Sequence, residues 1–210
     1  MTEIDTVLFD WNNTVVNDFR VWWDAIQETF RAFKQQPLTI KEYFEKLTGD
    51  YLELYRQRGI NASREELNSI YELSYERRIN EITLSPGIKG ILDFLNRRFI
   101  TTGLVTQQKY FLISPLLEKF GLNKGFNHCE CHALSKTEAI CRILQDEKIR
   151  PEQCCFIGDA PSDINHGKKA GVVTVAFLNG NVPEDLIIAA KPDFSIRSFE
   201  EIKKIVKKRG

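Results

Sequence analysis

Three carboxylates follow short apolar runs of this sequence, in positions where they could hold a metal ion. Asp10 ends the run TVLFD (6–10), Asp159 ends the run CCFIGD (154–159), and Asp163 stands four residues later. Because ligands of an open parallel sheet bind beyond the carboxyl ends of its strands, we expect all three at one rim. Two unit charges about 4 Å apart cost about 4 kcal/mol at an effective dielectric of about 20, so a cation must balance them. An all-oxygen site with few protein ligands suits Mg²⁺, which keeps several waters and bridges to phosphate.

Neutral and positive side chains are expected at the same rim. Asn12 follows Asp10 by two residues, Thr106 and Gln107 follow another apolar run, and Lys136 opens a helical segment before CCFIGD. A phosphate would add negative charge, so Mg²⁺ and Lys136 would both be needed to hold it. Thr106 and Gln107 can donate hydrogen bonds to phosphate oxygens. The pattern predicts a site for a phosphorylated ligand.

The elements that must position these residues alternate between strand and helix from Leu84 onward. Apolar runs of strand length occur at 102–106, 126–131, 154–159, 172–177 and 193–196, and segments of helical period at 86–98, 135–148 and 162–171. We place Pro86 just inside the start of the first of these helices and Gly171 at the end of the last. The alternation predicts an α/β fold with a doubly wound, Rossmann-like parallel sheet.

One stretch, from about Asn17 to Leu84, contains no convincing strand. Residues 17–36 and 63–79 are amphipathic, and Ser63 with Glu66 forms a plausible capping box. We therefore predict an α/β core domain of residues 1–16 and 85–210 and an inserted helical cap domain of residues 17–84. The aromatic residues of the insertion are expected mainly in its core: Trp22, Trp23, Phe30 and Phe33. Arg20 or the stretch 48–56 could face a substrate, and the sequence does not choose between them.

Composition narrows the class of protein. The 210 residues carry 29 basic and 29 acidic side chains, and a nucleic-acid binder more often has a basic excess. No run approaches the roughly 20 apolar residues of a membrane span, and the N-terminus does not read as a secretory signal. We expect a cytoplasmic protein with a small phosphorylated substrate, no nucleic acid and no membrane partner. The sequence does not indicate an oligomeric state, and the basic end 203–210 is expected on the exposed side of a last helix.

The five cysteines are interpreted as reduced thiols. Their number is odd, and Cys154 and Cys155 lie inside an apolar run. The stretch HCECH (128–132) holds four possible zinc ligands, but a strand would place its cysteines on one face and its histidines on the other. We therefore favour buried cysteines over a zinc site.

Four motifs in order give the chain a family resemblance: FDWNNT (9–14), LVT (104–106), Lys136 in LSKTEA, and IGDAPSD (157–163). Together with a cap-sized insertion after the first motif, they resemble the haloacid dehalogenase superfamily, in particular its phosphoglycolate-phosphatase-like branch. The resemblance implies a Mg²⁺-dependent, phosphatase-like hydrolase of a small metabolite. The family usually has a proline after the lysine, where this chain has Thr137.

The resemblance also implies a role for each matched residue. Asp10 is the nucleophile that takes the phosphoryl group. Asp10 and Asp159 give carboxylate oxygens to Mg²⁺, Asn12 gives its backbone carbonyl, and Asp163 supports the metal directly or through water. Thr106 and Lys136 hold the phosphoryl oxygens, and Lys136 also pairs with Asp10. For Asp163, a purely helix-capping role is an equally good reading that does not exclude the other.

Asn12 departs from the family pattern, because an aspartic acid usually stands there as general acid and base. Loss of this general acid and base would lower the reaction rate about 10²- to 10⁴-fold. The protein could be a slow phosphatase, a hydrolase of acyl phosphates or phosphonates, or a weak or inactive member that binds a phosphorylated ligand or partner. Asn13 replaces a common glycine, and asparagine tolerates the left-handed turn that the loop requires.

Overall fold

The structure, a computed structural model, describes residues 3–47 and 50–206. Its larger sheet has six strands, all paired in parallel, in the order β5-β4-β1-β6-β7-β8. The strands are β1 (Thr6–Phe9), β4 (Thr101–Val105), β5 (His128–Glu130), β6 (Cys154–Gly158), β7 (Val173–Phe177) and β8 (Phe194–Ile196). The predicted α/β class with a doubly wound parallel sheet is confirmed.

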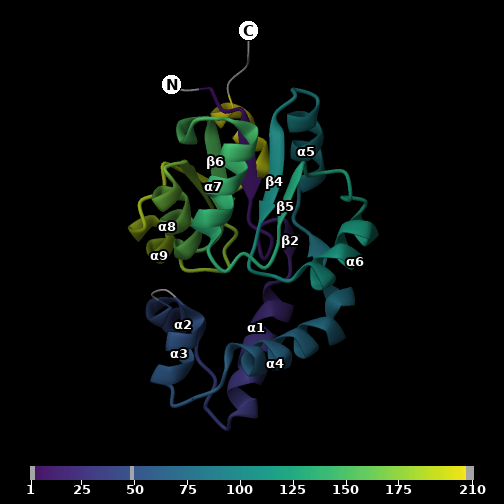
Figure 1. Ribbon diagram of the computed structural model, residues 1–210. Helices are drawn as coiled ribbons and strands as arrows, with labels where there is room; N and C mark the ends of the chain where they lie inside the picture. The colour runs from purple at the N-terminus through teal and green to yellow at the C-terminus, as the bar shows by residue number, and fades with distance from the viewer. Residues whose placement is uncertain (1–2, 48–49, 207–210) are drawn as a thin grey trace. The chain divides into compact units, whose positions relative to one another are not determined.

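Helices cover both faces of this sheet. They are α5 (Ile88–Asn96), α6 (Tyr110–Phe120), α7 (Lys136–Glu147), α8 (Pro161–Ala170), α9 (Glu184–Ala189) and α10 (Ile202–Ile205), with short 3₁₀ turns η2 (Pro151–Gln153) and η3 (Phe199–Glu201). Figure 1 shows α7 and α8 on one side of the sheet and α5 on the other. This division follows from right-handed crossovers that run in opposite directions from the centre of the sheet.

Two predicted helix boundaries have different outcomes. Gly171 ends α8 in the left-handed conformation, with φ of 77°, as expected. The placement of Pro86 inside α5 is wrong, because α5 begins at Ile88. Gly87 has φ of 86°, which no helix residue adopts, so the Pro-Gly pair forms a turn before the helix.

The central strand β1 is buried on both faces. Leu8 packs in an apolar cluster with residues of β6, α7 and α8, including Phe156, Ile140 and Ile143. Phe9 lies edge-on to Phe199 of η3, with ring centroids 6.3 Å apart. Burial of such a side chain is worth about 1.5–3 kcal/mol, so β1 is held in place by packing as well as by its two neighbouring strands.

The inserted segment forms a helical unit with its own core. It contains α1 (Phe19–Ala32), α2 (Ile40–Lys46), α3 (Tyr51–Gln57), α4 (Arg64–Arg77) and η1 (Ile79–Glu81). The capping box of Ser63 and Glu66 is present at the start of α4, as predicted. Phe30 is fully buried, and the other three predicted aromatic residues are half-buried against the same cluster. Arg20 is exposed, and within the stretch 48–56 residues 48 and 49 lie outside the described residues.

The chain divides into two compact units, one of them running from Asp18 to Thr83 and the other containing the large sheet. The strands β2 (Val16–Asn17) and β3 (Thr83–Leu84) pair where the chain passes between the units. The expectation of no strand between Asn17 and Leu84 is wrong at these two ends, because two-residue strands leave no alternating pattern. That the helical unit acts as a cap stays a prediction.

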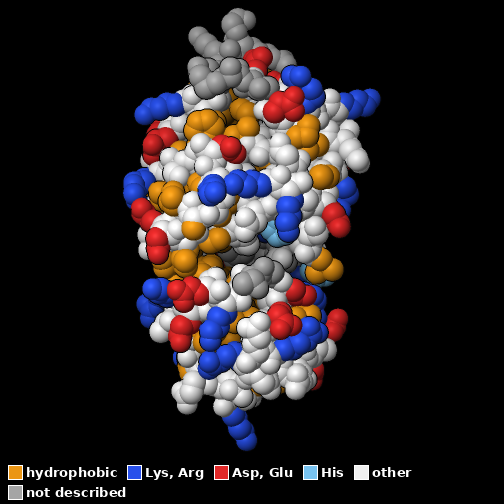
Figure 2. Space-filling model, turned by 90° about the vertical axis from the view of Figure 1, so that its left-hand side faces the viewer, with side chains coloured by type: hydrophobic (Ala, Val, Ile, Leu, Met, Phe, Trp, Pro, Cys, Tyr) orange, Lys and Arg blue, Asp and Glu red, His pale blue; other side chains and the backbone are white. Residues whose placement is uncertain are grey.

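Charged side chains of both signs are interspersed on the face shown in Figure 2. Among residues 3–47 and 50–206, no helix has the length and apolar character needed to cross a membrane. The last described helix, α10, carries exposed Lys203 and Lys204, whereas residues 207–210 of the basic end lie outside the described residues.

Candidate active site

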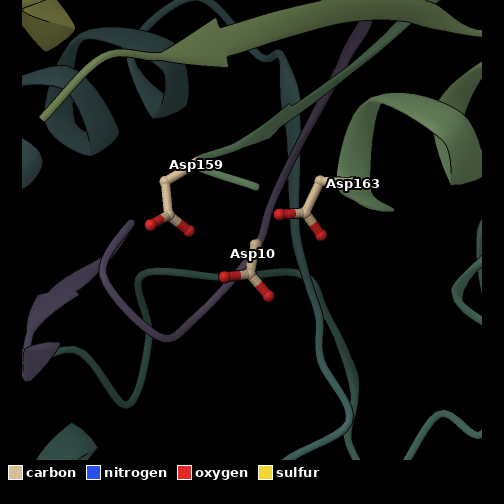
Figure 3. Close-up of side chains that lie close together, drawn as sticks. All are labelled: Asp10, Asp159 and Asp163. Atoms are coloured by element: carbon tan, nitrogen blue, oxygen red, sulfur yellow. The ribbon is translucent and has the colours of Figure 1, made fainter. Parts of the chain in front are cut away.

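Three carboxylates meet at one rim of the large sheet. Asp10 follows β1, Asp159 follows β6, and Asp163 lies in the first turn of α8. One oxygen from each lies within 4.8 Å of the others, and Figure 3 shows the three side chains gathered, with Asp10 drawn between its two neighbours. They are 2–4% exposed. Over the described part of the chain, they are the only group of three or more His, Cys, Asp or Glu side chains placed to share a metal ion.

The sheet register explains why two of these residues meet. β1 and β6 are adjacent and parallel, with Phe9 paired to Ile157, so the residues after each strand leave the sheet side by side. The backbone N–H of Asp10 also donates to the carbonyl of Ile157 at 2.8 Å, which extends the pairing to Asp10 itself. The predicted convergence of Asp10 and Asp159 is what the structure shows.

Asp163 reaches the rim because residue 158 is glycine. A Cβ atom on Gly158 would lie 2.4 Å from Cβ of Asp163, a distance that real Cβ atoms do not show. The Asp163 carboxylate also accepts a hydrogen bond from the N–H of Ala160 at 3.1 Å. The carboxylate therefore caps the start of α8 and lies at the rim at the same time, and its support of a metal ion stays a prediction.

Lys136 is the positive partner within the cluster. Its ammonium group donates to Asp10 Oδ1 and to Asp163 Oδ1, each at 2.6 Å, and the residue is 9% exposed. Lys136 is the first residue of α7, and Ser135 caps that helix by accepting from the N–H of Glu138 at 3.3 Å. The lysine side chain thus reaches both carboxylates from the start of α7, and the absence of a proline at residue 137 does not prevent the pairing.

The electrostatics of the rim favour a further positive charge. Burial raises the pKa of Asp10 to about 7, with Asp163 adding to the rise and Lys136 opposing it. Burial also raises the pKa of Asp159 well above its usual range, helped by the charges of Asp10 and Asp163. For Lys136 burial alone would lower the pKa, but the attraction of Asp10 and Asp163 outweighs it and the pKa is raised. One ammonium does not neutralise three carboxylates, and this imbalance is what a bound divalent cation would correct.

Asn179, which no sequence motif indicated, contacts the loop after Asp10. Asn13 has φ of 58°, the left-handed turn expected of it, and its carbonyl accepts from Nδ2 of Asn179 at 2.6 Å. The same Nδ2 lies 3.4 Å from Asp159 Oδ2, and the Asn179 side-chain oxygen accepts from the N–H of Asn181 at 2.9 Å. Asn179 therefore ties the loop to one of the carboxylates. It follows β7 by two residues, so the rule that directed attention to the ends of β1 and β6 would have found it.

The other predicted site residues lie near the ends of their strands. Asn12 is half-buried and forms an isolated bridge with Val16. Thr106 is buried directly after β4, the strand on the other side of β1, and its hydroxyl accepts from the N–H of Gln108 at 3.1 Å. Gln107, also expected to face a phosphate, is exposed.

The expectation that the cysteines of HCECH are buried is wrong for both of them. Cys129 is exposed and Cys131 is half-buried, because β5 is an edge strand that only β4 covers. Nε2 of His128 lies 2.6 Å from Glu147 Oε1 instead of meeting the thiols. The described residues of this stretch form no group of three metal ligands.

Comparisons with family models, curated proteins and solved structures agree on one family. The model of the haloacid dehalogenase-like hydrolase family matches residues 7–177. Pyrophosphatase PpaX of Oceanobacillus iheyensis is 23% identical, and the alignment covers 97% of each chain. Phosphoglycolate phosphatase of Synechococcus elongatus is 19% identical over 95% of each chain. A solved haloacid dehalogenase-like protein, SP0104 from Streptococcus pneumoniae, has a TM-score of 0.79 at 20% identity, with 99% of this chain and 100% of that chain covered, and shows the same fold.

The matched segment begins in β1, ends with β7 and contains every carboxylate of the rim. The chain belongs to the haloacid dehalogenase-like hydrolase family.

Proposed function

We propose that this protein is a Mg²⁺-dependent phosphatase-like hydrolase of a small phosphorylated metabolite, working through a phosphorylated Asp10. The observation that carries the proposal is the buried group of Asp10, Asp159 and Asp163, with Lys136 hydrogen-bonded to the first and the last. Phosphatase and pyrophosphatase relatives that match the chain over nearly its whole length support the same reaction class.

The donor set fits Mg²⁺. The three side chains offer carboxylate oxygens, which are hard ligands, and they are too few to fill six positions, which suits an ion that keeps several waters. Asp10, Asp159 and Asp163, with the backbone carbonyl of Asn12, would hold the ion. When bound, it would neutralise charge on the phosphoryl oxygens.

The protein's own groups then account for the two half-reactions. A carboxylate oxygen of Asp10 attacks phosphorus, the bond from phosphorus to the leaving oxygen breaks, and the leaving group departs with the electron pair. Water then attacks the phosphoryl group, loses a proton, and releases inorganic phosphate and free Asp10. Lys136 pairs with the nucleophile before attack and stabilises the equatorial oxygens during it, and Thr106 donates to the same oxygens.

Asn12 limits which leaving groups depart quickly. An amide can neither give a proton to the leaving oxygen nor take one from water, so that proton must come from solvent. Substrates whose leaving group is a weak base need no such proton. Acyl phosphates, phosphonates with a stabilised leaving carbanion, and phosphoanhydrides meet this condition. Pyrophosphate, the substrate named for the pyrophosphatase relatives, is a phosphoanhydride.

The test is a series of aryl and alkyl phosphates of decreasing leaving-group acidity, measured with and without Mg²⁺. Asp10→Asn should abolish turnover, and chelation should do the same for the wild type. Asn12→Asp should raise alkyl-phosphate turnover by about 10²-fold or more and change the best aryl substrates much less. Asn13→Asp is the matched control, since it adds the same charge one residue away and should give no such selective gain.

Two results would contradict the proposal. Turnover that survives both Asp10→Asn and chelation would mean that another group is the nucleophile. Absence of turnover in the wild type and in Asn12→Asp, for every substrate class, would favour a protein that binds a phosphorylated ligand without hydrolysing it.

A further inference from the structure

A second pair of reactive groups lies at the end of β5, outside the carboxylate cluster. Sγ of Cys129 lies 3.3 Å from Sγ of Cys131. Cys129 is exposed and Cys131 is half-buried, in contrast to the buried thiols of Cys154 and Cys155. The two accessible thiols are therefore already in contact, which the reaction of one with the other requires.

A hollow of about 390 Å³ gives small molecules access to the first of these thiols. Cys129 lines it together with residues of α6 and of the following loop, including Tyr110, Leu117, Asn123 and Phe126. The lining combines apolar rings with a few polar groups, which suits an organic molecule of modest size. Cys129 is thus reachable by a reagent larger than water.

The two thiols are not equivalent. The contact between the two thiols lowers the pKa of Cys129. The pKa of Cys131 is raised by the same contact, with burial adding to the rise. Cys129 is the more exposed of the two thiols and lines the hollow, so it is the group that reacts first, and Cys131 is the group that follows.

We propose that Cys129 and Cys131 form a thiol–disulfide exchange site that reacts with low-molecular-weight disulfides. The Cys129 thiolate attacks one sulfur of the small disulfide, which forms a mixed disulfide and releases one small thiol after it takes up a proton. The Cys131 thiol, on losing its proton, then attacks Sγ of Cys129 and releases the second small thiol. Two protein thiols are oxidised to one disulfide, and the small disulfide is reduced to two thiols.

Formation of this disulfide would constrain the segment between the two cysteines. Only Glu130 separates them, and the two sulfurs must approach from 3.3 Å to about 2.0 Å. The bond closes a small ring that contains the backbone of Glu130, so we expect this backbone to shift on oxidation.

That shift would reach Thr106, a consequence that rests on the proposed function. The N–H of Thr106 donates to the carbonyl of Glu130, the residue between the two cysteines, at 2.9 Å. The N–H of Ala133 donates to the carbonyl of Thr106, and that of His132 donates to the carbonyl of Gln108, both also at 2.9 Å. Three backbone hydrogen bonds thus join the dithiol segment to the loop proposed to hold phosphate, so oxidation should lower turnover reversibly.

The experiment treats the reduced full-length protein with oxidised glutathione and follows intact mass and the linked peptides. The wild type should lose two hydrogen atoms and give a peptide joined through Cys129 and Cys131. Cys131→Ser should stop at the mixed disulfide and gain one glutathione, whereas Cys129→Ser should gain none at residue 131 under the same conditions. Cys141→Ser is the matched control, because it removes another half-buried thiol and should behave as the wild type.

Activity is a separate readout. Oxidation should reduce phosphatase turnover of the wild type several-fold, dithiothreitol should restore it, and both single cysteine variants should resist the loss. Failure to form the Cys129–Cys131 disulfide would overturn the exchange site even in an active enzyme. Formation of the disulfide in a protein without phosphatase activity would leave the exchange site standing and count against the proposed function alone.

Discussion

Removal of divalent cations should make the stability of this protein fall as the pH rises. The pKa of Asp10 is raised from 3.8 to about 7 in the folded protein. Between these two values the native state keeps a proton that the unfolded chain has released, so the free energy of unfolding decreases with pH in that window. A shift of about three units at 1.36 kcal/mol per unit corresponds to a loss of about 4 kcal/mol. The raised pKa of Asp159 acts in the same direction.

The assay is urea unfolding in a chelator at pH 4.5, 5.5, 6.5 and 7.5, followed by circular dichroism. Asp10→Asn keeps the side-chain shape and cannot ionise, so its stability should vary less over this range. The variant should therefore be more stable than the wild type at pH 7.5 and lose that advantage at pH 4.5. Mg²⁺ at 100 times its dissociation constant should stabilise the wild type by about 2.7 kcal/mol, and it should do little for the variant.

Either of two outcomes would refute this reasoning. Wild-type stability that stays level from pH 4.5 to 7.5 without cations would mean that Asp10 ionises freely in the folded state. A parallel decline of the wild type and Asp10→Asn would assign the pH dependence to other groups.

Three further substitutions test the packing and pairing described above. Gly158→Ala should destabilise the protein by about 1–3 kcal/mol, measured by urea unfolding, because the new Cβ must displace Asp163. Lys136→Met should cost about 3–5 kcal/mol at pH 7.5 in a chelator, and added Mg²⁺ should recover part of the loss, which a purely steric defect would not allow. Tyr75→Phe should cost about 1–3 kcal/mol by thermal unfolding, since the buried Tyr75 hydroxyl donates to Asp18 at 2.6 Å, and an unchanged midpoint would contradict that role.

Sequence patterns predicted those parts of the site that follow from strand order. Asp10 and Asp159 each follow an apolar run, and parallel pairing of the two runs is sufficient to bring them together. Lys136 and Asp163 were expected at the same rim from their places at or near helix starts, but such a position does not by itself fix where the side chain points. Their contact depends on the missing Cβ of Gly158, a requirement that is visible only in three dimensions.

The errors arose where edge position or tertiary contact decides the outcome. Cys129 was expected to be buried because it lies in an apolar stretch, but β5 is an edge strand of the sheet. The order of the strands in the sheet cannot be deduced from one stretch of sequence. The position of Asn179 after the end of β7 follows the strand-end rule, but its contacts to Asn13 and Asp159 are visible only in the structure. The expected cytoplasmic location and the expected lack of a nucleic-acid partner stay predictions.

The N–H of Ser85 donates a backbone hydrogen bond to the carbonyl of Val15 at 3.1 Å, which has a consequence for the length of the insertion. It means that the helical insertion departs from the sheet-containing unit and returns to it at a single point. The entropic cost of bringing the two ends of the insertion together grows only slowly with the number of residues in the insertion. We therefore expect a change in the length of this insertion to leave the strand order and the carboxylate cluster intact.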